Sequence, residues 1–320
     1  MQIGLALGAG AAKGWAHVGV LQALNELDVT IECIAGTSIG ALIGGLFAAG
    51  TLDDFVQDML DMDWKRIISL IDLVFPKNGL IDGKKVTHLL KKYLPANIED
   101  LNLPFAAIST DLATGKEVVL EKGPLIEAIR ASISVPAIFT PVIKDNCCLV
   151  DGGLVNPVPV NIVRTLGTQK VLAVDLNYKY PWSKPQSFPI NSQPKPILPP
   201  PKRFCRKKLS LSPTSKLEKV SLSIKEKLAQ IEFTLLEEIR SWMTKADNTP
   251  HIFEIIHSSL ALMEVRLTEV LFKLHKPDLI LRPNLDQISF LDFHKGRLGI
   301  TIGYEATLNL FAANKSLLKN

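Results

Sequence analysis

The stretch IECIAGTSIGALIGGLFAA, residues 31–49, decides the fold class of this chain. Its first part, Ile31–Ala35, is short and mostly apolar, which is typical of a buried strand. The residues after Gly40 are apolar and rich in Gly and Ala, and we expect them to form a helix. Because Gly36 and Gly40 allow a sharp turn between the two, the stretch predicts a strand–turn–helix unit from which the Ser38 hydroxyl projects.

The same alternation of strand and helix continues outward from this unit. Short apolar runs predict strands, and residues such as Val18, Leu21 and Leu24 have helical spacing. This alternation predicts an α/β fold with a largely parallel sheet. The expected strands are residues 2–7, 31–35, 104–110, 117–120, 170–176 and 279–282, with a further short strand that ends at Asp151. One expected helix follows the first glycine-rich loop and ends near residue 27. Two or three more helical segments are expected within 52–94. Single helices are expected over 40–49, 125–132, 216–246, 250–275 and 302–313.

Composition excludes several classes of protein. The chain has 320 residues, of which 47% are apolar and 21% charged, so it can bury a large core and is neither disordered nor a disulfide-stapled miniprotein. The longest apolar candidate span, Ile252–Phe272, contains several charges and predicts an amphipathic helix rather than a membrane span. None of the four cysteines has C-x-x-C spacing, so the sequence signals neither a zinc site nor a redox motif. We expect no metal and no cofactor.

The N-terminus and the charge distribution bear on location. The first 16 residues are apolar but lack a basic start, and Lys13 interrupts them, so we expect no signal peptide and a cytoplasmic protein. The net charge is +4, but nine Lys and Arg residues and no Asp or Glu lie between Lys179 and Lys216. The segment 180–213 also holds nine of the 20 prolines, which is typical of extended or disordered chain.

The sequence Gly36-Thr-Ser-Ile-Gly40 is a G-x-S-x-G motif in the strand-to-helix context that such a motif requires. An ordinary glycine-rich turn is the alternative interpretation. A serine hydroxyl needs a base to become a nucleophile. The histidines downstream lie in expected amphipathic helices or polar segments, so the better candidate is Asp151, which ends an apolar run and precedes Gly152-Gly153. Such a base is efficient only where burial raises its pKa, so this interpretation requires a desolvated site.

The first loop, Gly8–Gly14, offers the third element of an ester-cleaving site. Its small side chains let a substrate oxygen approach backbone amides, as stabilisation of an oxyanion requires. A nucleotide-binding loop is the rival interpretation. It is disfavoured because Lys13 breaks the strict G-x-G-x-x-G pattern and because no G-K-[ST] sequence is present.

Four blocks in this order resemble the patatin-like phospholipase family, in particular its bacterial branch. They are the glycine-rich loop with Gly14-Trp-Ala-His-Val-Gly19, the segment 36–40, Arg130-Ala-Ser-Ile-Ser-Val-Pro136, and Asp151-Gly-Gly with Asn156-Pro157 behind it. The resemblance covers residues 1–177 and 250–310. It implies a three-layer α/β/α fold with a central, mostly parallel sheet.

The resemblance also implies the roles of individual residues. Ser38 would be the nucleophile and Asp151 its base, in a Ser–Asp dyad that cleaves acyl esters of lipids without a metal. Gly8, Gly10 and Ala11 would form the oxyanion hole. Ala9 stands where the family commonly has glycine, and an alanine takes a positive φ only with strain. Gly36 and Gly40 would shape the nucleophile elbow, and Gly152 and Gly153 the loop of the aspartate.

We therefore predict a serine hydrolase acting on lipids, of the phospholipase A or lysophospholipase type, that works through an acyl-enzyme. The alternative is a weakly active or inactive protein of this fold that acts as a binding or regulatory partner. The predicted organisation is a catalytic core at 1–177, a basic proline-rich insert at 178–215, and a segment at 216–320 that completes the same domain.

The basic insert is either a solvated linker or a point of peripheral contact with an anionic membrane, and nothing in it indicates nucleic-acid binding. An apolar helical face follows between residues 217 and 239, and it either packs into the core or covers a lipid site. The basic residues proposed for membrane contact are Lys202, Arg203, Arg206, Lys207 and Lys208.

Overall fold

The computed structural model describes residues 1–61, 72, 81–179 and 252–314. Residues 1–183 and 256–320 form one compact unit, and residues 184–255 form a second. The predicted basic insert from residue 180 onward and the predicted helix at 216–246 lie outside the described residues. The account below concerns the first unit.

An eight-stranded sheet forms the centre of this unit, with the strand order β5-β6-β3-β2-β1-β7-β8 and β4 paired to β3. Strands β3, β2, β1, β7 and β8 are parallel, whereas β4, β5 and β6 run antiparallel to their neighbours. The predicted α/β fold with a mostly parallel sheet is thereby confirmed. The strands are β1 Gln2–Leu7, β2 Thr30–Thr37, β3 Phe105–Asp111, β4 Glu117–Leu120, β5 Val142–Lys144, β6 Cys147–Asp151, β7 Val171–Val174 and β8 Leu279–Leu281.

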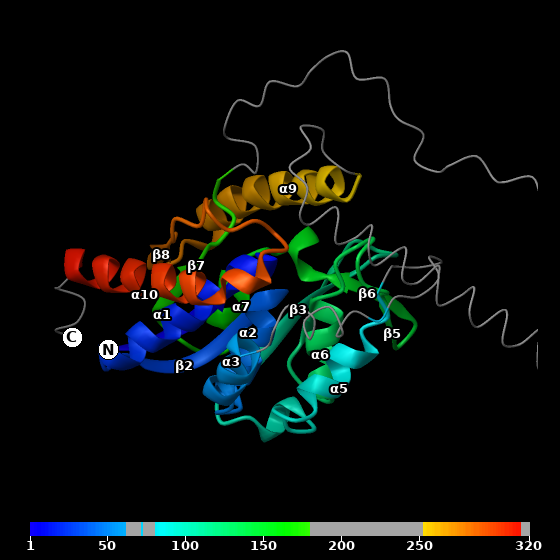
Figure 1. Cartoon of the computed structure of the whole chain (residues 1–320), viewed down its shortest axis with the longest axis horizontal. Coiled ribbons are helices and arrows are strands. Elements are labelled where there is room, and N and C mark those ends of the chain that lie inside the picture. Colours follow the sequence, from blue (N-terminus) through cyan, green and yellow to red (C-terminus); the bar gives the residue numbers. More distant parts are fainter. Residues whose placement is uncertain (62–71, 73–80, 180–251, 315–320) are drawn as a thin grey trace, which may run out of the picture. The chain divides into compact units, whose positions relative to one another are not determined.

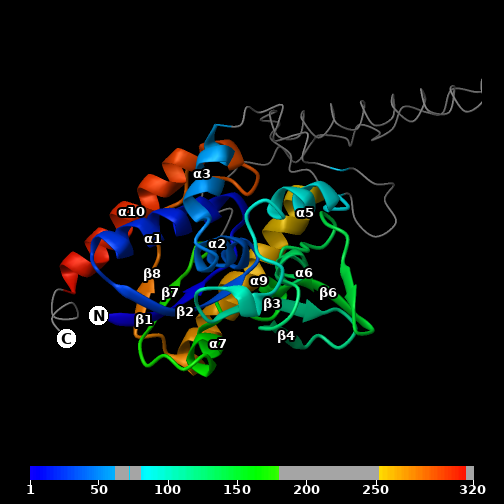
Figure 2. The ribbon, with the colours of Figure 1, turned by 90° about the horizontal axis from the view of Figure 1, so that it is seen from below.

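Helices cover both faces of the sheet, and Figure 2 shows α1 and α2 on one side of it and α7 on the other. Most lie where the sequence predicts them, but the short helix α7 was not expected, and α10 begins at Gly296 rather than at residue 302. The helices are α1 Trp15–Glu26, α2 Ile39–Ala48, α3 Leu52–Leu60, α5 Lys84–Leu90, α6 Leu125–Ser132, α7 Val160–Thr165, α9 Ile252–His275 and α10 Gly296–Ala313.

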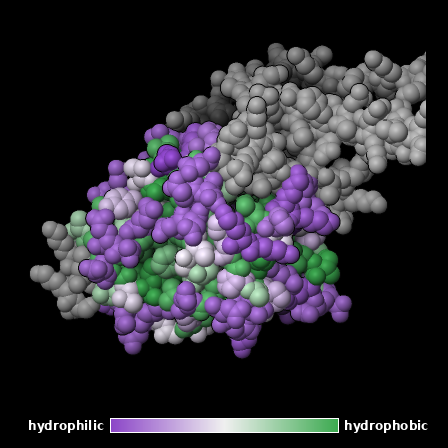
Figure 3. Space-filling view, turned by 60° about the horizontal axis from the view of Figure 1, so that its bottom comes forward, coloured by the Kyte–Doolittle hydropathy of each residue, from purple (hydrophilic) through white to green (hydrophobic). Residues whose placement is uncertain are grey.

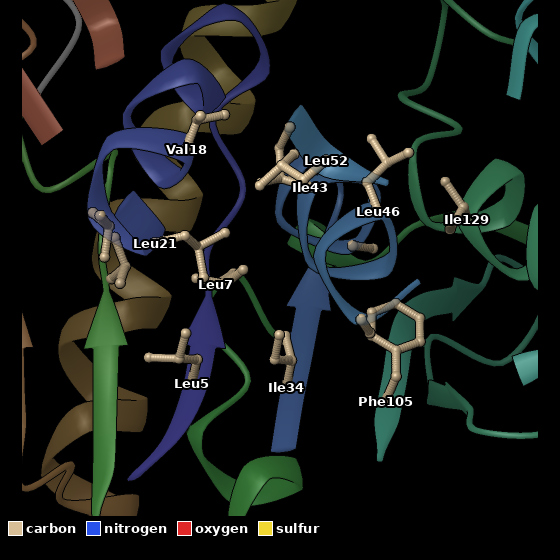
Figure 4. Packing of buried hydrophobic residues seen from close by; sticks show 14 of the residues in the cluster. Leu5, Leu7, Val18, Leu21, Ile34, Ile43, Leu46, Leu52, Phe105 and Ile129 are labelled. Atoms are coloured by element: carbon tan, nitrogen blue, oxygen red, sulfur yellow. The ribbon is translucent and has the colours of Figure 1, made fainter. Parts of the chain in front are cut away.

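The two faces of the sheet bury different residues because side chains alternate along a strand. On one face, large apolar side chains of β1, β2 and β3 meet those of α1, α2 and α6, as Figure 4 shows. On the other face the strands present mainly smaller residues, and Phe272 of α9 and the apolar side of α7 pack there. Both faces are therefore covered, as a parallel sheet requires. The labelled residues of the first face include Leu5, Leu7, Ile34, Phe105, Leu21, Leu46 and Ile129.

Helices α1 and α10 lie side by side and come unusually close (Figures 1 and 2). A methyl group added at Gly19 of α1 would lie 1.9 Å from Ile300 O, and one at Gly303 of α10 would lie 2.0 Å from Ala16 O. Glycine lowers helix propensity, which explains why the sequence pattern places the start of α10 too late. Here the missing side chains allow the two backbones to pack directly.

The face of the molecule in Figure 3 is mainly hydrophilic, with smaller apolar areas between the polar residues. Among the described residues, no helix has the combination of length and hydropathy that crossing a bilayer would require.

We predict that Gly303→Ala lowers the free energy of unfolding by about 1–3 kcal/mol, because the new methyl group overlaps Ala16 O. Helix propensity alone would change stability in the opposite direction, by up to about 1 kcal/mol. Urea denaturation followed by circular dichroism measures the change. Glu305→Ala, an exposed substitution on the same helix, should stay within about 0.5 kcal/mol of wild type. Equal stability of the two variants would contradict the close contact.

Candidate active site

Ser38 follows β2 and Asp151 ends β6, and both strands pair with the same edge of β3 because β4 occupies the other edge. Thr37, the last residue of β2, is opposite Ile108 of β3, and Asp151, the last residue of β6, is opposite Ser109. Because Ile108 and Ser109 are adjacent, the two strand ends meet at one level of the sheet. The side chains of Ser109 and Thr110 also bond to β6, at Val150 O and Asp151 O, with distances of 2.6 and 2.9 Å.

The Ser38 hydroxyl donates a hydrogen bond to Asp151 Oδ2 at 2.5 Å, and both side chains are buried. Ser38 has φ 57° and ψ −123°, a backbone conformation that costs a residue with a side chain roughly 1–3 kcal/mol. This turn positions the hydroxyl at the N-terminus of α2. The two flanking glycines are needed for space, since a methyl group at Gly36 would lie 2.4 Å from Gly40 O, and one at Gly40 would lie 2.1 Å from Leu7 O.

The Ser132 side chain holds the strained turn at Ser38 in place through two hydrogen bonds. Its hydroxyl accepts the Ser38 amide at 2.9 Å and donates to Ile108 O at 2.5 Å. The turn is therefore tied to β3 through one buried side chain of α6. The sequence alone assigned no role to Ser132, because its partners are distant in the chain.

The carboxylate of Asp151 is held from two directions. Oδ2 accepts the Ser38 hydroxyl, and Oδ1 accepts the amide of Gly153 at 2.8 Å. Burial raises the pKa of Asp151 to about 6, although both hydrogen bonds favour the charged form. A methyl group at Gly152 would lie 2.4 Å from Ile108 O, so the loop needs glycine there to follow β3 closely. The desolvation that the sequence argument requires is present.

Residues Ala9, Gly10 and Ala11 of the first loop line the same pocket. Gly8 donates to Val174 O and Ala9 donates to Pro157 O, both at 3.0 Å, so these amides hold the loop. Among the described residues, the amides of Gly10 and Ala11 have no acceptor. Of the three residues expected at an oxyanion hole, Gly10 and Ala11 therefore offer free donors. The positive φ falls at Ala11, at 47°, rather than at Ala9.

His17 of α1 fixes the start of this loop. It is completely buried, and its Nε2 donates to Gly8 O at 2.8 Å. Burial lowers the pKa of His17 to about 4, so the ring is neutral at physiological pH. Since a carbonyl can only accept, the ring proton lies on Nε2. His17 therefore acts as a structural donor.

Other residues of the segment 130–136 also have defined positions. The Arg130 guanidinium donates to Ser134 Oγ, to Asp82 O and to Thr140, and it stacks on Phe139. The backbone carbonyl of Ser134 accepts the amide of Asp151 at 2.9 Å. Val135 and Pro136 line the pocket in front of the serine. The segment thus builds one wall of the site.

Helix α9 supplies the opposite wall, which sequence reasoning missed. His257, Leu260 and Glu264 line the pocket together with Asn177 and Phe290. Burial and the charge of Lys13 lower the pKa of His257 to about 4, and its ring lies against Phe290 with centroids 3.6 Å apart. One signal in the sequence could have indicated this wall: the charged residue Glu264 has helical spacing to apolar positions of α9 that are buried, such as Ala261.

Among the described residues, no cluster of three or more His, Cys, Asp or Glu side chains is arranged to hold a metal ion. The polar groups of the pocket are instead two carboxyl groups, a serine hydroxyl, one side-chain amide, the ring of His257 and the backbone amides of Gly10 and Ala11. This set can activate a hydroxyl nucleophile and stabilise an anion that develops beside it.

Comparison with known proteins places these features in a family. An uncharacterised NTE family protein of Mycobacterium tuberculosis is 39% identical over 177 residues, which are 55% of this chain and 49% of that protein. A patatin-like phospholipase domain-containing protein of Caenorhabditis elegans is 40% identical over 182 residues, which are 54% of this chain and 13% of that protein. Rat patatin-like phospholipase domain-containing protein 7 is 34% identical over 185 residues, which are also 54% of this chain and 13% of that protein.

This chain thus spans less than half of each of these relatives. The crystal structure of VipD from Legionella pneumophila aligns over 97% of this chain and 67% of that chain, at 12% identity and a TM-score of 0.41. The family model described as patatin-like phospholipase matches residues 5–164, which are half of the 320 residues and include Ser38 and Asp151. The chain belongs to the patatin-like phospholipase family.

Proposed function

We propose that this chain is a serine acyl-ester hydrolase that acts on lipids, of the phospholipase A or lysophospholipase type. The observation that carries the proposal is the 2.5 Å hydrogen bond from Ser38 Oγ to Asp151 Oδ2 in a buried pocket. Membership of the family supports lipid hydrolysis in general. The two free amides of the first loop supply the donors that ester cleavage needs.

In the proposed acylation step, Asp151 accepts the proton of Ser38 while Ser38 Oγ attacks the carbonyl carbon of the ester. The carbonyl oxygen becomes an oxyanion and accepts hydrogen bonds from the amides of Gly10 and Ala11. The intermediate collapses, the bond from the carbonyl carbon to the alcohol oxygen breaks, and that oxygen takes the proton from Asp151. An acyl-enzyme on Ser38 and a free alcohol result.

Deacylation repeats the sequence with water as the nucleophile. Asp151 takes a proton from the water as its oxygen attacks the acyl carbon, and the same amides stabilise the second oxyanion. When the bond to Ser38 Oγ breaks, that oxygen regains its proton from Asp151, and the fatty acid leaves. The raised pKa of Asp151 suits this alternation, because the group is a better base than an exposed aspartate and is still ionised at neutral pH.

Access to the lipid is a separate part of the proposal. The basic segment that contains Lys202, Arg203, Arg206, Lys207 and Lys208 would bring the protein to an anionic bilayer, where each basic residue contributes about 1 kcal/mol. This segment lies outside the described residues, so membrane contact stays a prediction from the sequence.

Ser38→Ala should abolish both labelling by a fluorophosphonate probe and hydrolysis of a soluble short-chain ester, because the acyl-enzyme cannot form. Mass spectrometry should place the label of the wild type on Ser38. Thr301→Ala, which removes an exposed hydroxyl on α10, serves as the control and should label normally. A wild type that neither labels nor hydrolyses any ester would favour the alternative, an inactive protein with a binding or regulatory role.

The pH dependence should follow the ionisation of Asp151. A base works only when it is unprotonated, so kcat/KM should be half-maximal near pH 6, level off about one unit above it and fall about tenfold for each unit well below it. Asp151→Asn should reduce kcat by about 10²–10⁴-fold, because the amide cannot accept the serine proton. Steady-state kinetic assays on the soluble ester over a range of pH measure both effects. Near-normal turnover of Asp151→Asn would show that another group is the base.

Ser132→Ala should lower kcat by about tenfold or more, because the Ser38 amide and Ile108 O both lose their partner and the strained turn relaxes. Ser134→Ala is the matched control, since among the described residues this buried hydroxyl bonds only to Arg130. Each variant should lose about 1–3 kcal/mol of stability. Only Ser132→Ala should lose turnover as well, and an equal loss of kcat in both would contradict the supporting role.

A further inference from the structure

Glu264 is a titratable group of the pocket that the proposed mechanism does not use. It lies on α9, seven residues after His257, and both side chains line the pocket with Ser38 and Asp151. Its neighbours Ala261 and Val265 are buried, so the carboxyl group stands on the packed side of the helix. A carboxyl group in this position needs partners or a proton.

One oxygen of Glu264 lies beside the loop of the aspartate. A methyl group added at Gly153 would lie 2.6 Å from Glu264 Oε1 and 3.1 Å from Asp151 Oδ1. The two carboxyl groups therefore flank the same glycine, and only a residue without a side chain fits between them. Because the two carboxyl groups lie on either side of one glycine, a negative charge on one strongly disfavours a negative charge on the other.

The other oxygen is linked to the first loop. Asn177 Nδ2 donates to Glu264 Oε2 at 2.9 Å, and Asn177 Oδ1 accepts Lys13 Nζ at 3.1 Å. Since an amide N–H needs an acceptor, Oε2 serves as the carbonyl oxygen of Glu264. A proton on the carboxyl group would then reside on Oε1, which has no hydrogen-bond partner among the described residues and lies on the side of Asp151.

The surrounding charges favour that proton. Burial and the negative charge of Asp151 raise the pKa of Glu264 to about 8, while the bond from Asn177 and the charge of Lys13 act in the opposite direction. Asp175, which also raises it, is paired with Arg282 at 2.9 Å. His257 on the same helix is neutral, since its pKa is lowered to about 4. At neutral pH the pocket thus holds one ionised and one protonated carboxyl group.

We propose that Glu264, in its protonated form, is the hydrogen-bond donor with which the pocket holds an oxygen of the lipid beside the scissile ester. The inference rests on the hydrolase function proposed above and extends it to substrate recognition. A glycerol-based ester carries such an oxygen next to the bond that breaks. Loss of the proton removes this donor and adds a negative charge to the pocket in which the oxyanion forms, so the same group sets an upper pH limit for turnover.

Two neutral variants of Glu264 test the donor and the proton separately. Glu264→Gln keeps an N–H donor and never ionises, so kcat/KM for a short-chain glycerol ester should fall only about two- to fivefold at pH 7. Glu264→Met has similar length and no donor, and KM should rise about tenfold or more. Wild type should lose activity above about pH 8, and neither variant should show this fall. Glu269→Gln, exposed on the same helix, should behave as wild type.

Two kinetic results would overturn the inference. One is an alkaline fall that persists in Glu264→Gln, which would assign the upper limit to another group. The other is equal loss of activity in the Gln and Met variants, which would leave Glu264 a packing role only. If hydrolysis never depends on Ser38, the proposed function itself fails, and that result is recognised from Ser38→Ala before Glu264 is tested.

Infrared spectroscopy of the wild type keeps the test independent of activity and of how well the variants fold. Wild type at pH 7 should show a carboxylic-acid C=O band that disappears as the pH is raised through about 8, which identifies a protonated buried carboxyl group. In Glu264→Gln that band should be missing. A wild-type spectrum without the band at pH 7 would also overturn the inference.

Discussion

The hydrogen bond from Ser38 Oγ to Asp151 Oδ2 joins the ends of β2 and β6, two strands that do not pair with each other. It can form because β2 and β6 pair with successive residues along one edge of β3, which fixes the register of both. A slip of one residue in either ladder would turn a strand's side chains to the opposite face of the sheet. The hydroxyls of β3 that bond to the β6 carbonyls oppose such a slip. The site therefore depends on one central strand.

Several features of the site reduce stability where they stand. Ser38 has a strained backbone, Ala11 has a positive φ, two loop amides lack an acceptor among the described residues, and the carboxylate of Asp151 is buried. Each such feature costs on the order of 1–3 kcal/mol. The rest of the unit follows the ordinary rules, with apolar faces covered on both sides of the sheet. Such a concentration of exceptions is expected at a functional site.

The parts that the sequence predicts are those whose signal is local. The glycine-rich loop, the turn around Ser38 and Asp151-Gly-Gly each lie within a few residues, so spacing reveals them. The polar wall of the pocket could not be found in this way, because Asn177, His257 and Glu264 are far from Ser38 in the chain, and helical periodicity does not tell what a helix packs against. The short elements β5 and α7 are also missed, whereas β4 and β8, which are equally short, are predicted from their apolar residues, so length alone does not decide.

The two carboxyl groups of the pocket show how the same kind of side chain acquires two protonation states. Both are desolvated, but Asp151 accepts two hydrogen bonds that stabilise its charge, whereas Glu264 accepts one from a neutral amide and also faces the charge of Asp151. Between about pH 6 and pH 8 one is a base and the other an acid. Asp151 lies within the family match at 5–164, and Glu264 lies beyond it. The residues proposed for the reaction thus come from one part of the chain, and Glu264, which sets the polarity of the opposite wall, comes from another. Substitutions in α9 can therefore change the polarity of the pocket while Ser38 and Asp151 stay the same.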